Sequence, residues 1–390
     1  MKRKNVQHII LLLVCFFLYS CVENKQNKIN ELAKFEAEVN QIDNIINYDD
    51  LILECKLVQL ETSSQCLLGD IKKLLVSDEK IIVLSNDVYC FDNKGNFLFA
   101  LDKRGKGPDE FIRIDDISIS NNQIYLYDNS QWKILSFDIN SGDYLTSYRL
   151  PYSVPRIEIV GDKMIVDRLN FPNKLIKGKE RIFISTLNTP QHVISSYFSE
   201  QEYEIETEFQ FTGYNGAAYL SNPFRGRVYK LQADSVENYF QIKSNKMLTD
   251  NDIGVLLKQN IYSTNAISAS GKAYGFERFF ESNNFITYDF FIGNKKAYLV
   301  YDKNTRKNRV FCDVKREYYQ YPPIEFIGVY DDYFCKIINS ETIVLNNRVY
   351  LSDHKIDDLK FKTDSTYRII NTVSSEDNPI IALYKFKNIN

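Results

Sequence analysis

The sequence has 390 residues, of which 44% are hydrophobic and 25% are charged, a composition typical of a folded globular protein. Aromatic residues make up 14% of the chain, with 27 Tyr and 26 Phe, and such residues favour β-strands. The net charge is −3 and no basic stripe stands out, which argues against nucleic-acid binding, because that binding needs clustered Lys and Arg.

The chain begins with the features of an export signal. A basic start, MKRK, is followed by an apolar run from Ile9 to Leu18. That run is too short to span a bilayer and fits a secretory signal peptide over residues 1–20. Its end, LYSC, resembles the bacterial lipobox, and this resemblance implies that Cys21 is acylated and becomes the N-terminal residue. We therefore expect a lipid on Cys21 to anchor the mature chain to a membrane.

Residues 21–50 are predicted to form the lipidated cysteine, a polar tether and a short helix. From Lys28 to Asn47 the apolar residues recur at steps of three and four, which predicts one apolar helical face packed on the following domain. The residues of that face are Ile29, Leu32, Phe35, Val39, Ile42 and Ile46.

The remaining cysteines show no spacing typical of a disulfide framework or of a zinc site. They are odd in number and scattered: Cys55, Cys66, Cys90, Cys312 and Cys335. A bridge between Cys55 and Cys66 stays open, but we favour buried free thiols.

Residues 51–390 contain a repeat of short apolar strands separated by polar turns. The stretches Leu74–Gly95, Ile117–Gly142 and Ile157–Asn170 share a strand–turn–strand scheme that predicts antiparallel meanders. Ala218–Leu231 and Ala297–Val314 repeat the scheme. The blocks start near residues 71, 115, 155, 208, 276 and 324. A unit of about 40–50 residues made of short strands is typical of a β-propeller. The sequence therefore predicts an all-β fold, a six-bladed β-propeller with four-stranded antiparallel blades.

Two strands are left over at the ends of this domain. Leu51–Glu61 is a strand with no meander of its own, and Asn378–Lys387 is a final strand with no partner after it. Pairing them would close the ring and remove two exposed sheet edges. We expect this closure.

The stretch DKRGKGPDEF, Asp102–Phe111, combines two glycines, a proline and several charges. It lies between the last strand of the first block and the first strand of the second. The GxxxxGK[ST] spacing of a phosphate-binding loop is absent. Gly105, Gly107 and Pro108 are residues that turns need, and Phe111 is placed to fill the space between two blades. The stretch is predicted to be a corner between blades.

Several of these features together resemble the six-bladed β-propeller lipoproteins of Bacteroidetes, which are relatives of NHL-repeat propellers. The features are the lipobox, GKGPDEF with the following IDDISIS, IYLYDNSQWKILSFD, and the terminal SSEDNPIIALYKFK. Asp128 with Lys133, and Asn222 with Arg227, occupy the positions of an acidic or amide residue and a basic residue in NHL-like repeats. The resemblance implies the fold and an address in the cell envelope. It implies no established activity, and such proteins are usually binding or accessory components, some of them near nutrient-uptake systems.

No catalytic, cofactor-binding or metal-binding residue is predicted. His192 and His354 are the histidines outside the signal, and neither lies in a metal or triad motif. The paired acids Asp115-Asp116 and Asp331-Asp332, and Glu281, are candidates for a glycosidase-like carboxylate pair. We favour turn or solvated positions for them, because only their abundance marks them.

Candidates for recognition lie on turns and near strand ends. Trp132 sits in a turn between two strands of the second block, and the equivalent later turn offers Phe224 and Arg225. Aromatic and arginine side chains on loops at one end of a rigid ring commonly contact partners or sugars, although packing against the adjacent loop is the competing interpretation. A further set is placed to face a central channel and bind an anionic group: Arg104, Arg156, Arg168 and Arg278.

Together these features predict a monomeric, lipid-anchored binding or scaffold module of the bacterial cell envelope, without enzymatic activity, accessory to nutrient or glycan uptake. Its partner would be an envelope protein, or a glycan or peptide ligand, and not nucleic acid. We expect the outer membrane, with the periplasmic and cell-surface faces both open. The alternative is a lyase or hydrolase that uses carboxylates, Arg and Tyr on the propeller face.

Overall fold

The structure is a computed structural model, and it describes residues 29, 32–77, 79–168, 180–199, 211–214, 216–233, 235–258, 264–316, 320–353 and 369–390. The predicted signal peptide, Cys21 and His354 lie outside these residues.

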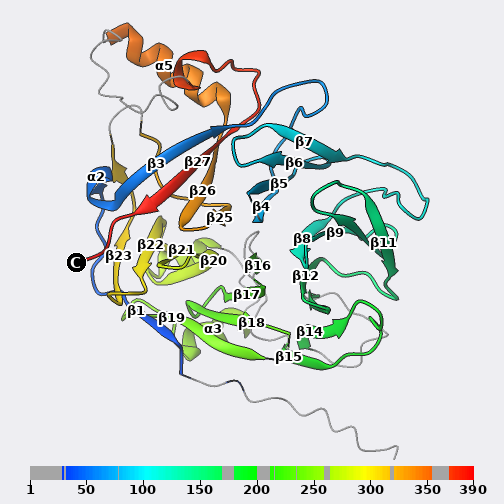
Figure 1. The fold of residues 1–390 in the computed structure, drawn as a ribbon. Coiled ribbons are helices and arrows are strands. Elements are labelled where there is room, and N and C mark those ends of the chain that lie inside the picture. Colours follow the sequence, from blue (N-terminus) through cyan, green and yellow to red (C-terminus); the bar gives the residue numbers. More distant parts are fainter. Residues whose placement is uncertain are drawn as a thin grey trace, which may run out of the picture.

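Six antiparallel sheets surround a central axis, which confirms the predicted six-bladed β-propeller (Figure 1). The first blade is β4 (Lys73–Ser77), β5 (Lys80–Leu84), β6 (Val88–Asp92) and β7 (Phe97–Leu101). The second is β8 (Asp116–Ser120), β9 (Gln123–Asp128), β10 (Lys133–Asp138) and β11 (Tyr144–Arg149). The third is β12 (Arg156–Val160), β13 (Lys163–Asp167), β14 (Glu180–Thr186) and β15 (Ser195–Ser199).

The second half of the ring repeats the arrangement. The fourth blade contains β16 (Phe211–Tyr214), β17 (Ala217–Asn222), β18 (Arg227–Leu231) and β19 (Val236–Lys243). The fifth is β20 (Ala273–Glu281), β21 (Phe285–Ile292), β22 (Lys295–Asp302) and β23 (Lys307–Phe311). The sixth is β25 (Gly328–Tyr330), β26 (Tyr333–Ile338), β27 (Ile380–Phe386) and β3 (Ile52–Gln59). Helices occupy excursions from the blades: α3 (Asp250–Lys258), α4 (Thr264–Ala269) and α5 (Ser340–Asp353).

The ring closes through the two ends of the propeller domain, as predicted. Strand β27 pairs antiparallel with β3, in a register that runs from Ile380 opposite Gln59 to Phe386 opposite Ile52. In Figure 1 the blue N-terminal strand and the red C-terminal strand lie side by side in this blade. The pairing supplies the sixth blade with its outermost strand, so that neither terminal strand is left alone.

The helix predicted over Lys28–Asn47 is wrong for the described part of that range. There the chain forms β1 (Phe35–Glu38), which pairs parallel with β19, and β2 (Ile46–Asn47), which pairs with β24 (Val314–Lys315). Phe35, Ala37 and Val39 are buried at every second position, which is the period of a strand. The edge of β19 offers unpaired backbone groups, and pairing with them favours the extended form. A short helix does precede the first blade, but it is α2 (Tyr48–Leu51).

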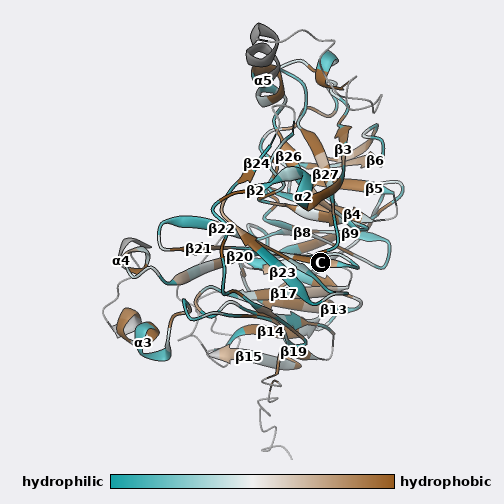
Figure 2. Cartoon of the chain, turned by 90° about the vertical axis from the view of Figure 1, so that its left-hand side faces the viewer, coloured by the Kyte–Doolittle hydropathy of each residue, from teal (hydrophilic) through white to brown (hydrophobic). Residues whose placement is uncertain are grey.

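The core lies within and between the blades, where apolar side chains of neighbouring sheets meet. Figure 2 shows brown, hydrophobic residues along many of the strands and teal, hydrophilic residues in many of the turns. The cysteines follow this pattern: Cys66, Cys90 and Cys335 are buried, and all five described cysteines are free thiols.

The stretch Asp102–Phe111 is the corner between the first and second blades. Phe111 is fully buried between them, and its backbone N–H donates to the Lys103 carbonyl at 3.0 Å. Lys133 is buried and its Nζ donates to the carbonyl oxygens of Gly107, at 2.9 Å, and of Glu110. Gly105 has a φ of +156°, and a side chain there would collide with the Glu110 carboxylate.

Asp128 completes the same corner. One of its carboxylate oxygens accepts a hydrogen bond from the Ile112 backbone N–H at 2.6 Å, and the other accepts from the Gln131 N–H at 3.1 Å. The Asp128 and Lys133 pair of the repeat therefore fixes the corner through its backbone groups.

Ring closure can be tested with two substitutions in the sixth blade. Ile381 lies on β27 in the apolar cluster that joins this blade to the first, whereas Leu53 lies on β3 and is 60% exposed. Ile381→Ala should lower the free energy of unfolding by about 2–5 kcal/mol, because it leaves a cavity in that seam. Leu53→Ala should change it by less than about 0.5 kcal/mol. Urea denaturation measures both, and equal effects would contradict the closure.

Candidate ligand site in the central channel

A cavity of about 1080 Å³ occupies the centre of the ring and is lined by the innermost strands of the blades. These strands are β4, β8, β12, β16, β20 and β25. Charged side chains of both signs line it. The acidic ones are Glu79, Asp115, Asp116, Glu158 and Asp331, and the basic ones are Lys72, Lys73 and Arg156.

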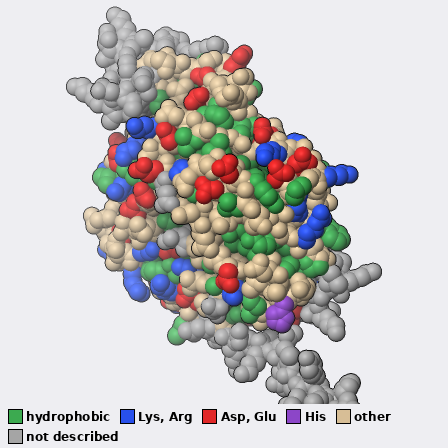
Figure 3. All heavy atoms as spheres, turned by 45° about the vertical axis from the view of Figure 1, so that its right-hand side comes forward, with side chains coloured by type: hydrophobic (Ala, Val, Ile, Leu, Met, Phe, Trp, Pro, Cys, Tyr) green, Lys and Arg blue, Asp and Glu red, His purple; other side chains and the backbone are tan. Residues whose placement is uncertain are grey.

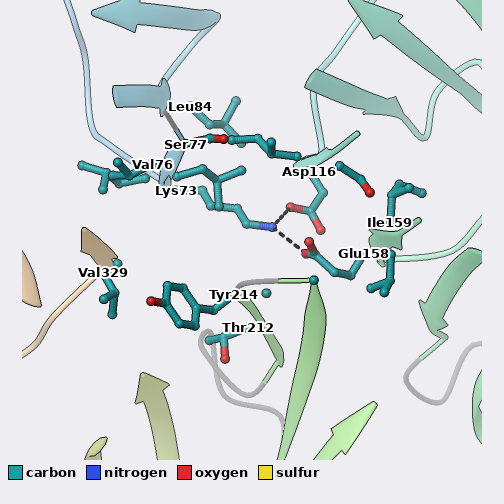
Figure 4. Close-up of a pocket in the computed structure, with 18 of the residues that line it drawn as sticks. Lys73, Val76, Ser77, Leu84, Asp116, Glu158, Ile159, Thr212, Tyr214 and Val329 are labelled. Atoms are coloured by element: carbon teal, nitrogen blue, oxygen red, sulfur yellow. Dashed lines mark hydrogen bonds and ion pairs between the residues drawn. The ribbon is translucent and has the colours of Figure 1, made fainter. Parts of the chain in front are cut away.

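Three of these side chains form one cluster that joins the first three blades (Figure 4). Lys73, the first residue of β4, donates from Nζ to Asp116 Oδ1 at 2.8 Å and to the Ile117 carbonyl at 2.7 Å. The same Nζ lies 3.6 Å from Oε2 of Glu158 on β12. The cluster thus holds two carboxylates and one ammonium group.

Backbone and hydroxyl donors fix the two carboxylates in place. Asp116 accepts from the backbone N–H of Ile117 at 2.8 Å and from that of Ile157 at 3.3 Å. Glu158 Oε1 accepts from the Ser118 hydroxyl at 2.7 Å, and that hydroxyl oxygen accepts from the Ile159 N–H at 3.0 Å. These bonds connect β8 to β12 and hold both acids toward Lys73.

Burial and neighbouring charges shift the pKa values of both Lys73 and Glu158. Burial lowers the pKa of Lys73, but the charges of Asp116 and Glu158 outweigh it and hold that pKa above its ordinary value. Burial raises the pKa of Glu158 to about 6, although the charge of Lys73 and the Ser118 hydrogen bond oppose the rise. Glu158 as a whole residue is only 5% exposed, and its Oε2 accepts no hydrogen bond from the described residues.

Gly213 of β16 makes room for this carboxylate. A Cβ atom at position 213 would lie 2.3 Å from both Cδ and Oε2 of Glu158. A side chain at position 213 would therefore displace the carboxylate, so glycine at this position lets Glu158 keep its place in the cluster.

Tyr214, the next residue of β16, supplies an aromatic wall. Figure 4 shows its ring in the cavity, on the side of Val329. Burial raises the pKa of Tyr214 to about 12, so its hydroxyl stays protonated at neutral pH. The wall and the charged cluster together give the cavity an apolar side and a polar side.

Of the four arginines expected at the channel, Arg156 alone lines this cavity in the part of the chain that is described. Arg104 lies over the ring of Phe111, 4.8 Å from its centroid, and donates to the Ile112 carbonyl at 2.8 Å. Arg168 is buried beside β13, and Arg278 donates to the Phe326 carbonyl at 3.2 Å.

The turn residues differ in how far they are exposed. Trp132 is 47% exposed, with a φ of +52°, in the turn between β9 and β10. Phe224 is 2% exposed and packs in a small apolar cluster with residues of α3 and α4, so its ring belongs to the core. Arg225 pairs with Asp250, with 2.6 Å between Nη1 and Oδ1. Trp132 remains the exposed aromatic of this set, and its role in binding stays a prediction.

Glu281, one of the acids named from the sequence, lies away from the charged cluster of the channel. Glu281 is buried, and it accepts hydrogen bonds from the Tyr219 hydroxyl at 2.6 Å and from Tyr239 and Lys303. Burial acts to raise the pKa of Glu281, but these hydrogen bonds hold it below its ordinary value. Glu281 therefore acts as an internal link between the fourth and fifth blades.

Lys73, Glu158 and Gly213 were not singled out from the sequence. A signal for the first two existed in the repeat: Lys73, Asp116 and Arg156 are each the first residue of an innermost strand. Equivalent positions of successive blades point to the same region of a propeller, and Glu158 follows Arg156 at the two-residue period of one strand face.

No metal centre is found: within the described ranges, no group of three or more His, Cys, Asp or Glu residues could hold an ion. His192 is exposed. None of the helices in the described part of the chain is long and apolar enough to cross a membrane.

The contact between Gly213 and Glu158 can be tested by a double-mutant cycle. Gly213→Ala should destabilise the protein by about 1–3 kcal/mol, because the new methyl group overlaps the carboxylate. In a Glu158→Ala background the same change should cost much less, since the obstructing group is gone. Denaturant titration of the four proteins measures the coupling. Gly254→Ala, which has no atom near the new methyl group, is the control. A cycle with no coupling would contradict the contact.

Comparison with known proteins places the chain in a family and supports the fold. The model of the family described as "Domain of unknown function (DUF4934)" matches residues 33–385. A crystal structure of a "putative exported protein" from Bacteroides fragilis has a TM-score of 0.69 and 17% identity, covering 91% of this chain and 99% of the other. A member of the DUF4221 family from Bacteroides vulgatus has a TM-score of 0.49 and 11% identity, with 87% and 98% covered. None of the curated proteins matches the sequence. The chain is a six-bladed β-propeller that belongs to the DUF4934 family.

Proposed function

We propose that this protein is an exported, lipid-anchored binding module of the cell envelope, whose propeller captures a ligand in its central channel without chemical turnover. The observation that carries the proposal is the channel itself, a cavity of about 1080 Å³ with a fixed cluster of charged side chains on its wall. Concave sites with a few well-placed polar groups are where small ligands commonly bind.

Export and anchoring are supported by the N-terminal sequence. The basic start, the apolar run and the cysteine at position 21 have the order of a lipoprotein signal. The structural neighbour from Bacteroides fragilis also has an exported-protein description. A lipid on Cys21 followed by a short polar segment would tether the propeller close to the membrane. The membrane proposed is the outer membrane, and the propeller can lie on either of its faces.

An accessory role in nutrient or glycan uptake fits the surface of the propeller. Trp132 is exposed at the rim, where it is available to an envelope partner or to a sugar ring. On the face drawn in Figure 3, acidic and basic side chains are interspersed with hydrophobic ones. Such a mixed surface suits a protein or glycan partner better than a polyanion.

A second candidate function, a lyase or hydrolase, is favoured by one observation. Glu158 has a pKa raised to about 6 and lies beside a second carboxylate, Asp116, in the same cluster. A carboxyl group with a raised pKa can donate a proton near neutral pH, as a general acid does. Lys73 lies between the two acids and binds both, which fits a static binding site better than a catalytic pair.

Anchoring is tested by two cysteine variants expressed in the native host. Cys21→Ser should release the protein from the membrane fraction and abolish labelling by an alkyne-tagged fatty acid, because the acylated thiol is missing. Cys15→Ser, within the apolar run, should leave both unchanged. Fatty-acid labelling that persists in the Cys21→Ser protein would contradict the lipid anchor at this residue.

Binding without turnover is tested with the mature propeller on panels of oligosaccharides and short peptides. Each mixture is assayed both for complex formation and for products by mass spectrometry. The proposal predicts a complex whose ligand is recovered intact and whose affinity changes at least tenfold in Lys73→Met, because that substitution alters the charge of the channel cluster. Products that disappear in Glu158→Gln would establish the enzymatic alternative. Binding that responds to Trp132→Ala but not to Lys73→Met would move the site from the channel to the rim.

A further inference from the structure

We propose that the channel site recognises a primary ammonium group on its ligand, and that the carboxylate of Glu158 binds this group beside Lys73. The inference rests on the proposed binding function and names the chemical class of the ligand. It follows from the geometry of one buried cluster and from the charges that surround it.

The cluster has one negative charge more than it can neutralise. Lys73 directs its two short hydrogen bonds to Asp116 Oδ1 and to the Ile117 carbonyl. It lies 3.6 Å from Glu158, which is close enough for an ion pair but too long for a good hydrogen bond. One ammonium group therefore neutralises two carboxylates in part, and its stronger interaction is with Asp116.

The unmet hydrogen-bonding capacity of Glu158 lies on a single oxygen atom. Glu158 Oε1 is satisfied by the Ser118 hydroxyl, whereas Oε2 is buried and accepts no hydrogen bond from the residues described. A buried acceptor without a donor is energetically unfavourable. Either a proton or a donor from a ligand can remove this cost. At neutral pH the carboxyl group is mostly ionised, because its pKa is about 6.

A cationic donor fits this oxygen better than a neutral one. A hydrogen bond between an ammonium group and a carboxylate is roughly twice as strong as one between neutral groups. An ammonium ion also cancels the surplus charge of the cluster, which a sugar hydroxyl does not. Lys73 shows that this environment holds an ammonium group, since its pKa is raised there in spite of burial.

The rest of the cavity wall also favours a cation. Its acidic side chains outnumber its basic ones by five to three. Tyr214 of β16 offers an aromatic ring to the same cavity, and aromatic faces attract cations. The anion expected at the channel arginines is disfavoured, because Arg156 lines this cavity without Arg104, Arg168 or Arg278 and shares it with Asp115, Asp116 and Glu158.

Access to Glu158 is limited to the channel side. Ser118 of β8 covers one carboxylate oxygen and the backbone of Gly213 on β16 lies against the other. The charged groups that face the acid are Lys73 from β4 and Asp116 from β8, and Gly213 adds no charge. We therefore expect a compact primary ammonium group to reach this acid more easily than a bulky cation.

The test uses pairs of probes that differ only in whether the amine is free or acetylated. The pairs are ethanolamine and N-acetylethanolamine, glucosamine and N-acetylglucosamine, and alanylalanine amide and its N-acetyl form. Isothermal titration to the mature wild-type protein should show that each free amine binds at least tenfold more tightly than its acetylated twin. The order among the three amines identifies whether a simple amine, an amino sugar or a peptide N-terminus is preferred.

Two further measurements place the effect at Glu158. Glu158→Gln should lower the affinity for the free amines at least tenfold and leave the affinity for the acetylated probes unchanged. Glu79→Gln, which removes the same charge elsewhere in the cavity lining, should change the affinities by less than threefold. In the wild type, lowering the pH from one unit above to one unit below the Glu158 pKa of about 6 should weaken amine binding about tenfold, because the carboxylate takes up a proton.

The outcomes separate this inference from the proposed function. Equal binding of amines and acetylated twins would leave a binding module but overturn the ammonium site. Absence of amine binding to the wild type at millimolar concentration would overturn it as well. The pH series on the wild type decides the matter even if Glu158→Gln fails to fold, since pH-independent amine binding contradicts a role for Glu158.

Discussion

The pairing of β3 with β27 is the constraint on which this propeller depends. Each blade buries its faces against its two neighbours, so the ring is stable only when the first and last blades also meet. The sixth blade takes its outermost strand from the start of the domain and the strand beside it from the end of the chain. Backbone hydrogen bonds from Ile380 to Phe386 therefore hold together segments more than three hundred residues apart in sequence. With the ring closed, neither end of the domain presents a free strand.

Closure also determines where the chemistry of the molecule lies. Six innermost strands converge on one axis, and side chains at equivalent positions of successive blades come within reach of one another. Lys73 and Asp116 meet in this way, and Glu158, two residues after the equivalent position of the third blade, joins them. Gly213 adds a contribution from a fourth blade by having no side chain. The cluster is thus a product of the ring and does not exist in any single repeat.

Much of the fold could be predicted from the sequence because it is repeated. Alternating apolar strands at a regular spacing predicted the blades, and two unpaired strands at the ends predicted the closure. The glycines and proline of Asp102–Phe111 predicted a corner, and the buried Phe111 and Lys133 show how that corner is held. The helix over Lys28–Asn47 failed because the apolar spacing there also fits a strand. Pairing with the edge of β19, which the local sequence pattern does not reveal, favours the strand over the helix.

The site was harder to predict than the fold, since its residues are remote in sequence and individually ordinary. The sequence marks Asp116 as one of two adjacent acids, but no motif in it marks Lys73 or Glu158 as its partners. Arginines near strand ends were expected at the channel, yet the direction of a side chain at a strand end depends on local turns. Arg156 reaches the cavity, whereas Arg104 lies on Phe111. Burial separated the two aromatic candidates in the same way, leaving Trp132 exposed and Phe224 in the core.

The claim that Glu158 is the ligand-binding acid of the channel can be tested most directly by carbon NMR of protein labelled at the glutamate carboxyl groups. The Glu158 signal is assigned by its loss in Glu158→Gln. The account predicts that this signal titrates near pH 6 in the free protein and that saturating ethanolamine lowers the midpoint by about one unit, because a bound cation stabilises the carboxylate. A midpoint that ethanolamine leaves unchanged would contradict it.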